Sequence, residues 1–179
     1  FAGVFAVAAA ANWWSRLEDG RHRTERWSKP LALIALIAVA VSLQPADQLV
    51  RAWFVVALVC SLGGDVFLMY GDRYFVPGLL AFLLAHLAYT FGFLAFDDWS
   101  WTAFLVGAVM TGALAFTVGV RIVLAARREE RMLAPAVTAY LLAISLMFCA
   151  AMATGSTWAI LGAALFVASD SVLGWRQFV

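Results

Sequence analysis

Long apolar stretches separated by short polar connections run along the whole chain. A transmembrane helix needs about 20 apolar residues, or about 17 at the short end. Seven segments meet this length or come close to it: Phe1–Trp14, Trp27–Leu43, Val50–Tyr70, Phe75–Phe96, Trp101–Ala125, Leu133–Thr154 and Trp158–Trp175. The pattern therefore predicts an all-α fold, a polytopic transmembrane helix bundle with seven spans.

The first two segments are less typical transmembrane spans than the other five. Phe1–Trp14 is too short to span a bilayer, and we interpret it as the remainder of a longer helix. The second segment can span if Lys29 extends its ammonium group towards the interface, beside Pro30 in the first turn. No connection is long enough to form a separate domain, and no internal repeat is visible. We expect one transmembrane domain over residues 1–179, truncated at both ends.

The composition supports a membrane protein. Hydrophobic residues make up 65% of the chain and charged residues 13%, whereas soluble domains average about 45–50% and about 25%. The net charge is +1, with no basic tail, so a nucleic-acid partner is not expected. Cys60 and Cys149 lie in apolar runs without metal-ligand spacing, and we interpret them as small buried hydrophobic residues. No cofactor is expected.

The basic residues predict an orientation. Eleven of the twelve lie in or beside odd-numbered connections, and Arg51 alone belongs to an even-numbered one. Positive charges accumulate on the cytoplasmic side of membrane proteins. We therefore expect the odd-numbered connections to be cytoplasmic, with the chain in a bacterial inner membrane.

Two carboxylates lie inside predicted spans. Asp65 and Asp170 are at membrane depth, whereas the other nine acids fall in polar connections. A charged residue at the centre of a span costs roughly 2.5–3.5 kcal/mol on insertion scales, which favours a functional reason for keeping it. Each aspartate lies about six residues, or roughly 9 Å, before the cytoplasmic end of its span. Their equal depth on different helices predicts one shared site.

Other polar and aromatic residues lie near that level. His86 is the only intramembrane histidine, and it shares a helix face with Phe82, Tyr89 and Phe93. Tyr140 lies near the depth of the aspartates, where an acid would suit its hydroxyl group. A lone histidine in an aromatic stripe is more often a packing element than a catalyst, so both interpretations of His86 stay open.

Three serines are close to the aspartates along the chain. Ser61 precedes Asp65 by one turn, and Ser169 and Ser171 flank Asp170. Each is a candidate donor to a carboxylate, although serines in membrane helices commonly bond back to their own backbone.

The sequence lacks the motifs of several common kinds of catalytic and binding site. No cluster of three His, Cys or carboxylate ligands predicts a zinc site, and neither a GxSxG motif nor a phosphate-binding glycine loop occurs. What remains is a carboxylate pair in an apolar cavity, which suits general acid–base hydrolysis of an acid-labile bond.

The motifs around these residues resemble those of the YhhN/TMEM86 family, the lysoplasmalogenase-like multi-pass membrane proteins. The resemblance rests on Lys29–Pro30, Ser61-Leu-Gly-Gly-Asp65-Val-Phe-Leu-Met69, Phe75-x-x-Gly78-x-x-x-Phe82-x-x-x-His86-x-x-Tyr89, Tyr140 with Met147, and Gly162-Ala-x-Leu-Phe166-x-x-Ser169-Asp170-Ser171. Family members have eight transmembrane helices, so the resemblance implies that a last helix is missing here. It also implies that Asp65 and Asp170 are the catalytic pair.

The resemblance implies a substrate and a reaction. The substrate would be a lysoplasmalogen, a lysophospholipid with a vinyl ether, and the products a fatty aldehyde and a glycerophospho-alcohol. One aspartic acid would protonate the terminal alkene carbon, and the other would stabilise the oxocarbenium ion and orient or deprotonate water. Which aspartate does which stays open. The residues expected to bind substrate or support the site are His86, Tyr140, Tyr89, Phe82, Ser169 and Lys29.

Two alternatives use the same acids. A proton-coupled transporter of small molecules or lipids, or a lipid-binding protein, would use intramembrane carboxylates as proton relays, and would show pH-dependent flux without products. An intramembrane aspartyl protease is disfavoured, because Leu62 occupies the position of the first glycine in a GxGD signature.

Overall fold

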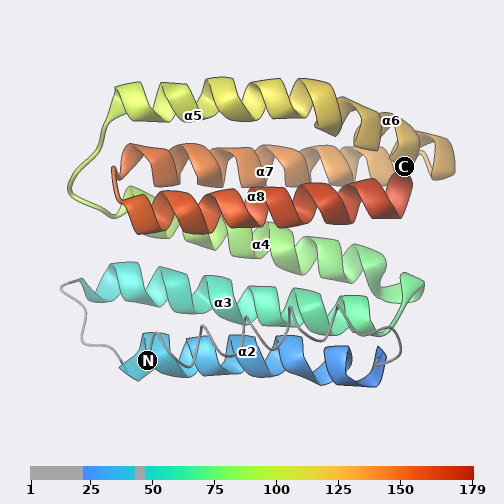
Figure 1. Cartoon of the computed structure of the whole chain (residues 1–179), viewed down its shortest axis with the longest axis horizontal. Coiled ribbons are helices and arrows are strands. Elements are labelled where there is room, and N and C mark those ends of the chain that lie inside the picture. The colour runs from blue at the N-terminus through green and yellow to red at the C-terminus, as the bar shows by residue number, and fades with distance from the viewer. Residues whose placement is uncertain (1–21, 43–46) are drawn as a thin grey trace. The chain divides into compact units, whose positions relative to one another are not determined.

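The computed structural model describes residues 22–42 and 47–179, and all regular structure within them is helical (Figure 1). The elements are α2 His22–Ser42, α3 Gln48–Met69, the 3₁₀ turn η1 Asp72–Tyr74, α4 Phe75–Leu94, α5 Trp101–Leu114, the π-helical segment η2 Ala115–Gly119, α6 Val120–Glu129, α7 Leu133–Ala153 and α8 Thr157–Phe178. The predicted all-α fold is confirmed for these residues.

Five of the predicted spans are confirmed as helices long and apolar enough to cross a membrane: Gln48–Met69, Phe75–Leu94, Trp101–Glu129, Leu133–Ala153 and Thr157–Phe178. The count of seven is not matched in the described part of the chain. The first predicted span, Phe1–Trp14, lies outside the described residues. The second corresponds to α2, whose described apolar part is only Leu33–Ser42. Ten helical residues rise about 15 Å, half of a bilayer's hydrocarbon core.

The chain forms two compact units, of which the first ends at Ala85 and the second begins at His86, within α4. A single domain over residues 1–179 stays a prediction.

In the first unit, α2 and α3 pack against each other. Asp47 caps α3, because its carboxylate accepts hydrogen bonds from the backbone N–H groups of Leu49 at 2.7 Å and Val50 at 3.4 Å. The Arg51 guanidinium donates to the Val41 carbonyl at 3.4 Å. This contact joins the start of α3 to the end of α2.

Two glycines bring α3 close to the first half of α4. A Cβ atom on Gly64 would lie 2.5 Å from the Phe82 ring, and one on Gly78 would lie 2.9 Å from the Leu68 side chain. No side chain larger than hydrogen fits at either position without movement of its neighbour. Small residues permit such close approach of membrane helices.

Helix α7 is the centre of the second unit, where it packs against α5, α6 and α8. Its buried positions recur along most of its length, from Val137 to Ala153. At the contact with α5, a Cβ atom on Gly107 would lie 3.0 Å from the Cys149 Cα atom. The Thr111 hydroxyl lies 3.8 Å from the Cys149 sulfur. Cys149 is a buried free thiol, as predicted, and Cys60 is half-buried.

The span before α7 is one continuous helix, Trp101–Glu129, interrupted by the π-helical segment η2. Thr117, within that segment, donates to the Ala113 carbonyl at 2.9 Å and to the Leu114 carbonyl at 3.2 Å. Beyond the segment, Ile122 of α6 is buried and faces Gly174 of α8, where a Cβ atom would lie 3.2 Å away. The same span therefore contacts α7 through both α5 and α6, and it contacts α8 through α6.

A tight turn of three residues, Thr154–Ser156, joins α7 to α8. Gly155 has φ of 64°, which favours glycine there. The Thr154 hydroxyl accepts from the Ser156 N–H at 3.2 Å, and the Ser156 hydroxyl caps α8 by accepting from the Ala159 N–H at 3.5 Å. The two helices consequently form an antiparallel hairpin of fixed register.

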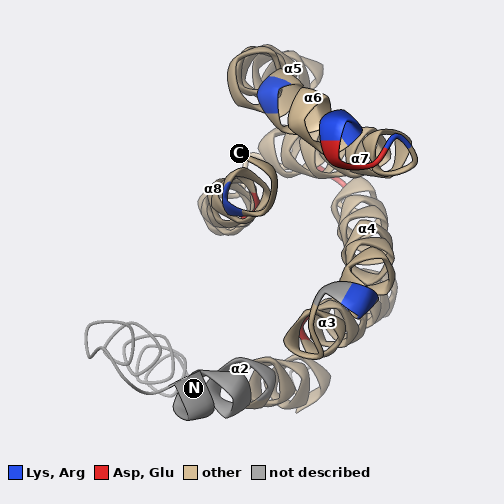
Figure 2. Ribbon diagram, turned by 90° about the vertical axis from the view of Figure 1, so that its right-hand side faces the viewer, with Lys and Arg blue, Asp and Glu red and all other residues tan. Residues whose placement is uncertain are grey.

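Charge is unevenly distributed between the two ends of the second unit. Because α6, α7 and α8 run antiparallel in turn, the α6–α7 connection and the end of α8 lie at the same end of the unit. All five arginines of the unit lie in this region: Arg121, Arg127, Arg128, Arg131 and Arg176. Figure 2 views the helices end-on and shows basic residues on α6 and α8. Asp97 and Asp98 occupy the α4–α5 connection at the opposite end.

The contact at Gly107 gives a test of the α5–α7 packing. Gly107→Leu would force its side chain against the α7 backbone, so we expect a loss of about 1–3 kcal/mol in the free energy of unfolding. Gly112→Leu is the matched control, because a Cβ atom there meets nothing within 4 Å. Unfolding in detergent, followed by tryptophan fluorescence, measures both variants. Equal stability of the two variants would contradict the packing.

Candidate functional site

The α7–α8 hairpin brings two polar residues to the same level. Tyr140 lies 14 residues before Thr154, and Asp170 lies 14 residues after Ser156. In two antiparallel helices joined by a tight turn, positions equally far from the turn lie side by side. The hairpin register therefore places the phenol of α7 beside the carboxylate of α8.

The Tyr140 hydroxyl donates a hydrogen bond to Asp170 Oδ2 at 2.5 Å. Tyr140 is only 8% exposed and the Asp170 side chain only 13%. The sequence-based expectation that Tyr140 would find an acid at its own depth is confirmed. Hydrogen bonds to a charged group are about twice as strong as those between neutral groups.

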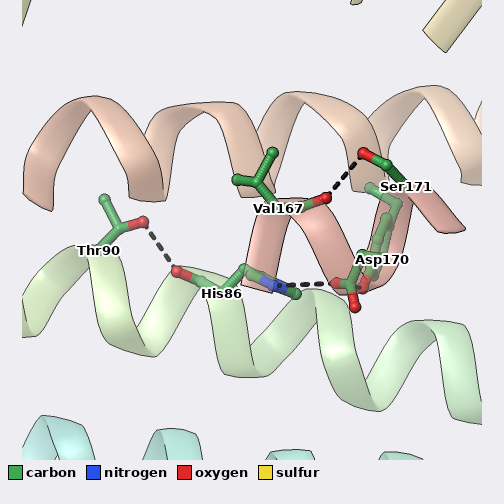
Figure 3. A network of polar contacts seen from close by, with 6 residues as sticks. His86, Thr90, Val167, Asp170 and Ser171 are labelled. Atoms are coloured by element: carbon green, nitrogen blue, oxygen red, sulfur yellow. Dashed lines mark hydrogen bonds and ion pairs between the residues drawn. The ribbon is translucent and has the colours of Figure 1, made fainter. Parts of the chain in front are cut away.

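His86 of α4 contacts the same carboxylate oxygen (Figure 3). Its Nε2 atom lies 3.5 Å from Asp170 Oδ2, and the residue is fully buried. The imidazole stands edge-on to the Tyr140 ring, with centroids 5.2 Å apart and an interplanar angle of 82°. Three spans thus supply one side chain each to a buried cluster of carboxylate, phenol and imidazole.

Two further aromatic rings enclose this cluster. Phe166 lies edge-on to His86 with centroids 5.8 Å apart, and it also contacts Tyr89 at 5.5 Å. Tyr89 is buried. Phe166 was not among the predicted site residues. Its position four residues before Asp170 was the available signal, since residues at that spacing share a helix face.

The serine and threonine hydroxyl groups near the cluster bond to the backbone. Ser171 donates to the Val167 carbonyl at 2.7 Å, and Thr90 donates to the His86 carbonyl at 2.8 Å (Figure 3). Ser171 therefore follows the backbone alternative and not the donor role towards Asp170. Ser169 is exposed on α8.

The remaining predicted site residues belong to the first unit. Asp65 is half-buried on α3, directly after Gly64, and Phe82 packs its ring against that glycine. Lys29 lies in α2, and its side chain falls outside the described part of the structure. A site shared by Asp65 and Asp170 stays a prediction.

The cluster around Asp170 has groups suited to proton transfer. Carboxyl, phenol and imidazole groups can each donate or accept a proton, and here they meet in an apolar, water-poor setting. Both the Tyr140 hydroxyl and the His86 Nε2 atom contact Oδ2 of the carboxylate. In the described residues, no group of three His, Cys, Asp or Glu side chains is placed to hold a metal ion.

Comparison with known proteins gives consistent matches. The model of the YhhN family matches residues 24–179. A protein of Mycobacterium tuberculosis named lysoplasmalogenase is 30% identical over 152 residues, covering 83% of this chain and 58% of that protein. The human protein named lysoplasmalogenase TMEM86B is 37% identical over 124 residues, covering 68% of this chain and 50% of that protein. The chain thus spans roughly half the length of these curated relatives. No solved structure gives a significant match.

The Tyr140–Asp170 hydrogen bond can be tested without any assay of activity. Tyr140→Phe keeps the ring against His86 but removes the donor, so we expect a loss of about 1.5–3 kcal/mol in the free energy of unfolding. In a double-mutant cycle with Asp170→Asn, the two losses should not add. Tyr70→Phe is the control, because Tyr70 is 72% exposed. Additive losses in denaturant titrations would show that the two groups do not interact.

Proposed function

The chain belongs to the YhhN family, and from this premise we propose that it is a membrane-embedded hydrolase of the vinyl ether bond in lysoplasmalogen-type lysolipids. The products are a fatty aldehyde and a glycerophospho-alcohol. The names of its relatives support this substrate class. The observation that carries the proposal is the buried carboxylate of Asp170, held by Tyr140 and close to His86 inside a membrane-spanning hairpin.

The reactivity of a vinyl ether explains why acid–base groups suffice to hydrolyse it. Protonation of the terminal alkene carbon converts the bond into an oxocarbenium ion, which water captures as a hemiacetal. The hydroxyl group of the hemiacetal then loses its proton and forms the aldehyde carbonyl, while the carbon–oxygen bond to the glycerol oxygen breaks and that oxygen takes up a proton. A positioned acid lowers the barrier of the first step, and a carboxylate stabilises the cation and receives the proton of water.

We assign these two tasks to the pair Asp65 and Asp170. Each lies on a helix of membrane-spanning length, in its second half: Asp65 on Gln48–Met69 and Asp170 on Thr157–Phe178. Tyr140 and His86 hold and orient the Asp170 carboxylate, while Tyr89 borders the acyl chain. Phe82, Ser169 and Lys29 are further residues that we assign to substrate binding or support of the site.

The proposed setting is a bacterial inner membrane with the odd-numbered connections in the cytoplasm. The five arginines at one end of the second unit support this orientation by the positive-inside rule. The second predicted span, which includes α2, crosses the membrane with the help of Lys29 at the interface.

The aspartate pair is tested by single substitutions. Asp65→Asn and Asp170→Asn each keep the shape of the side chain but remove its acid–base function, so aldehyde release from a lysoplasmalogen should fall by about 10²–10⁴-fold. Asp98→Asn, in the exposed α4–α5 connection, should retain full activity. The assay uses purified protein in detergent or vesicles and a coupled aldehyde reductase.

A saturated alkyl ether lysolipid serves as the matched control substrate, because it cannot form the oxocarbenium ion by protonation. Full activity of either aspartate variant would overturn the aspartate-pair mechanism. If the wild type releases no aldehyde but carries a pH-dependent flux in vesicles, the transporter alternative replaces the hydrolase.

The orientation has its own test. In a chain with Cys60 and Cys149 replaced by alanine, a cysteine at Asp98 should react with a membrane-impermeant maleimide added to intact cells. A cysteine at Glu130 should react only after the membrane is opened. The reverse labelling pattern would contradict the orientation.

A further inference from the structure

Ser61 of α3 is a buried hydroxyl group that makes no hydrogen bond to the described residues. The residue is only 1% exposed. A buried polar group without a partner is destabilising, and such groups are rare in native structures. The position of Ser61 therefore needs an explanation.

Six other hydroxyl groups on the described helices follow a different rule. They donate to a backbone carbonyl three or four residues earlier, as serines and threonines in helices commonly do. The residues that do so are Ser42, Thr90, Thr111, Thr117, Thr138 and Ser171. Ser61 has the same local option, towards the carbonyl of Ala57, and does not use it.

The packing of α3 against α4 explains why no protein group meets the hydroxyl. Leu68 lies against Gly78, and Gly64 lies against Phe82. Extending these antiparallel pairs by one level places Ser61 beside Ala85, which is 1% exposed and offers no side-chain hydrogen-bonding group. The polar side chain nearest along the helix is Asp65, one turn later, on the same face.

We propose that Ser61 holds the water molecule that attacks the oxocarbenium ion, beside Asp65. The inference rests on the proposed function. The Ser61 hydroxyl and the Asp65 carboxylate are spaced one helical turn apart, roughly 5–6 Å between Cβ atoms, which a single water can bridge. A water bound there has one partner to orient it and one to accept its proton.

The attack of water on the oxocarbenium ion conserves atoms and charge. The water oxygen forms a bond to the cationic carbon, and the π bond between that carbon and the ether oxygen breaks, so the oxygen becomes neutral. The proton lost by the water passes to the Asp65 carboxylate. The product is the hemiacetal. Asp65 is then the base of the pair, and Asp170, with Tyr140 and His86 around it, is the acid.

The test combines rate and product in the Ser61→Ala variant, which lacks the hydroxyl group that orients the water. Its kcat should fall by roughly 10–100-fold with an unchanged KM. In added methanol, it should release more of the mixed methyl acetal relative to aldehyde, because the attacking molecule is no longer selected. Ser171→Ala is the matched control, since that hydroxyl is already bonded to the backbone, and it should change neither the acetal fraction nor kcat.

Each outcome has a definite meaning. A Ser61→Ala variant with unchanged kcat and acetal fraction would overturn the water site while leaving the proposed hydrolase intact. Ser61→Cys, with a weaker donor of similar size, should give the same changes to a smaller degree and serves if the alanine variant does not fold. A wild type that releases no aldehyde would refute the proposed function, and the water site with it.

Discussion

The hydrogen bond between Tyr140 and Asp170 is the constraint on which the second unit depends. A carboxylate on a membrane-spanning helix is costly unless it has partners, and Asp170 finds two on other helices. Meeting the phenol requires α7 and α8 to be antiparallel and in a single register. The three-residue turn with Gly155 at positive φ provides that register. The tight packing of α7 by its neighbours then keeps Tyr140 in place.

Much of this arrangement could be predicted from the sequence, because membranes impose simple rules. The apolar lengths predicted five spans whose ends differ only slightly from the helices observed. Counting residues from the basic connections placed Tyr140 and Asp170 at a similar depth, and the two side chains do meet. The depth of a residue in its span does not predict which side chains of other helices it contacts. The contacts of His86 with Asp170 and Phe166 depend on how three helices turn about their axes, which no periodicity within one span determines. For α2, the described apolar part is too short for its length alone to identify a membrane span.

The polar side chains of the described helices fall into two groups: those bonded to their own backbone and those that remain available for a reaction. Six hydroxyl groups are bonded to their own helix and present no polar atom to their surroundings. Such residues can lie anywhere in a span at little cost. The groups available for chemistry are those that the local backbone does not engage, namely the carboxyl, phenol and imidazole around Asp170 and the hydroxyl of Ser61. The hydrogen-bonding state of a side chain is therefore a better guide to its role here than its residue type.

The π-helical segment Ala115–Gly119 has a consequence for the evolution of the bundle. A π turn accommodates one extra residue, and at 3.6 residues per turn that residue rotates everything beyond it by about 100°. Before the segment, Gly107 and Thr111 face α7. Beyond it, α6 packs against α7 and also against α8, where Ile122 faces Gly174. Removing one residue from the segment would restore a regular helix and turn Ile122 away from α8. An insertion that became fixed in this way would let one span serve two neighbours without lengthening any loop.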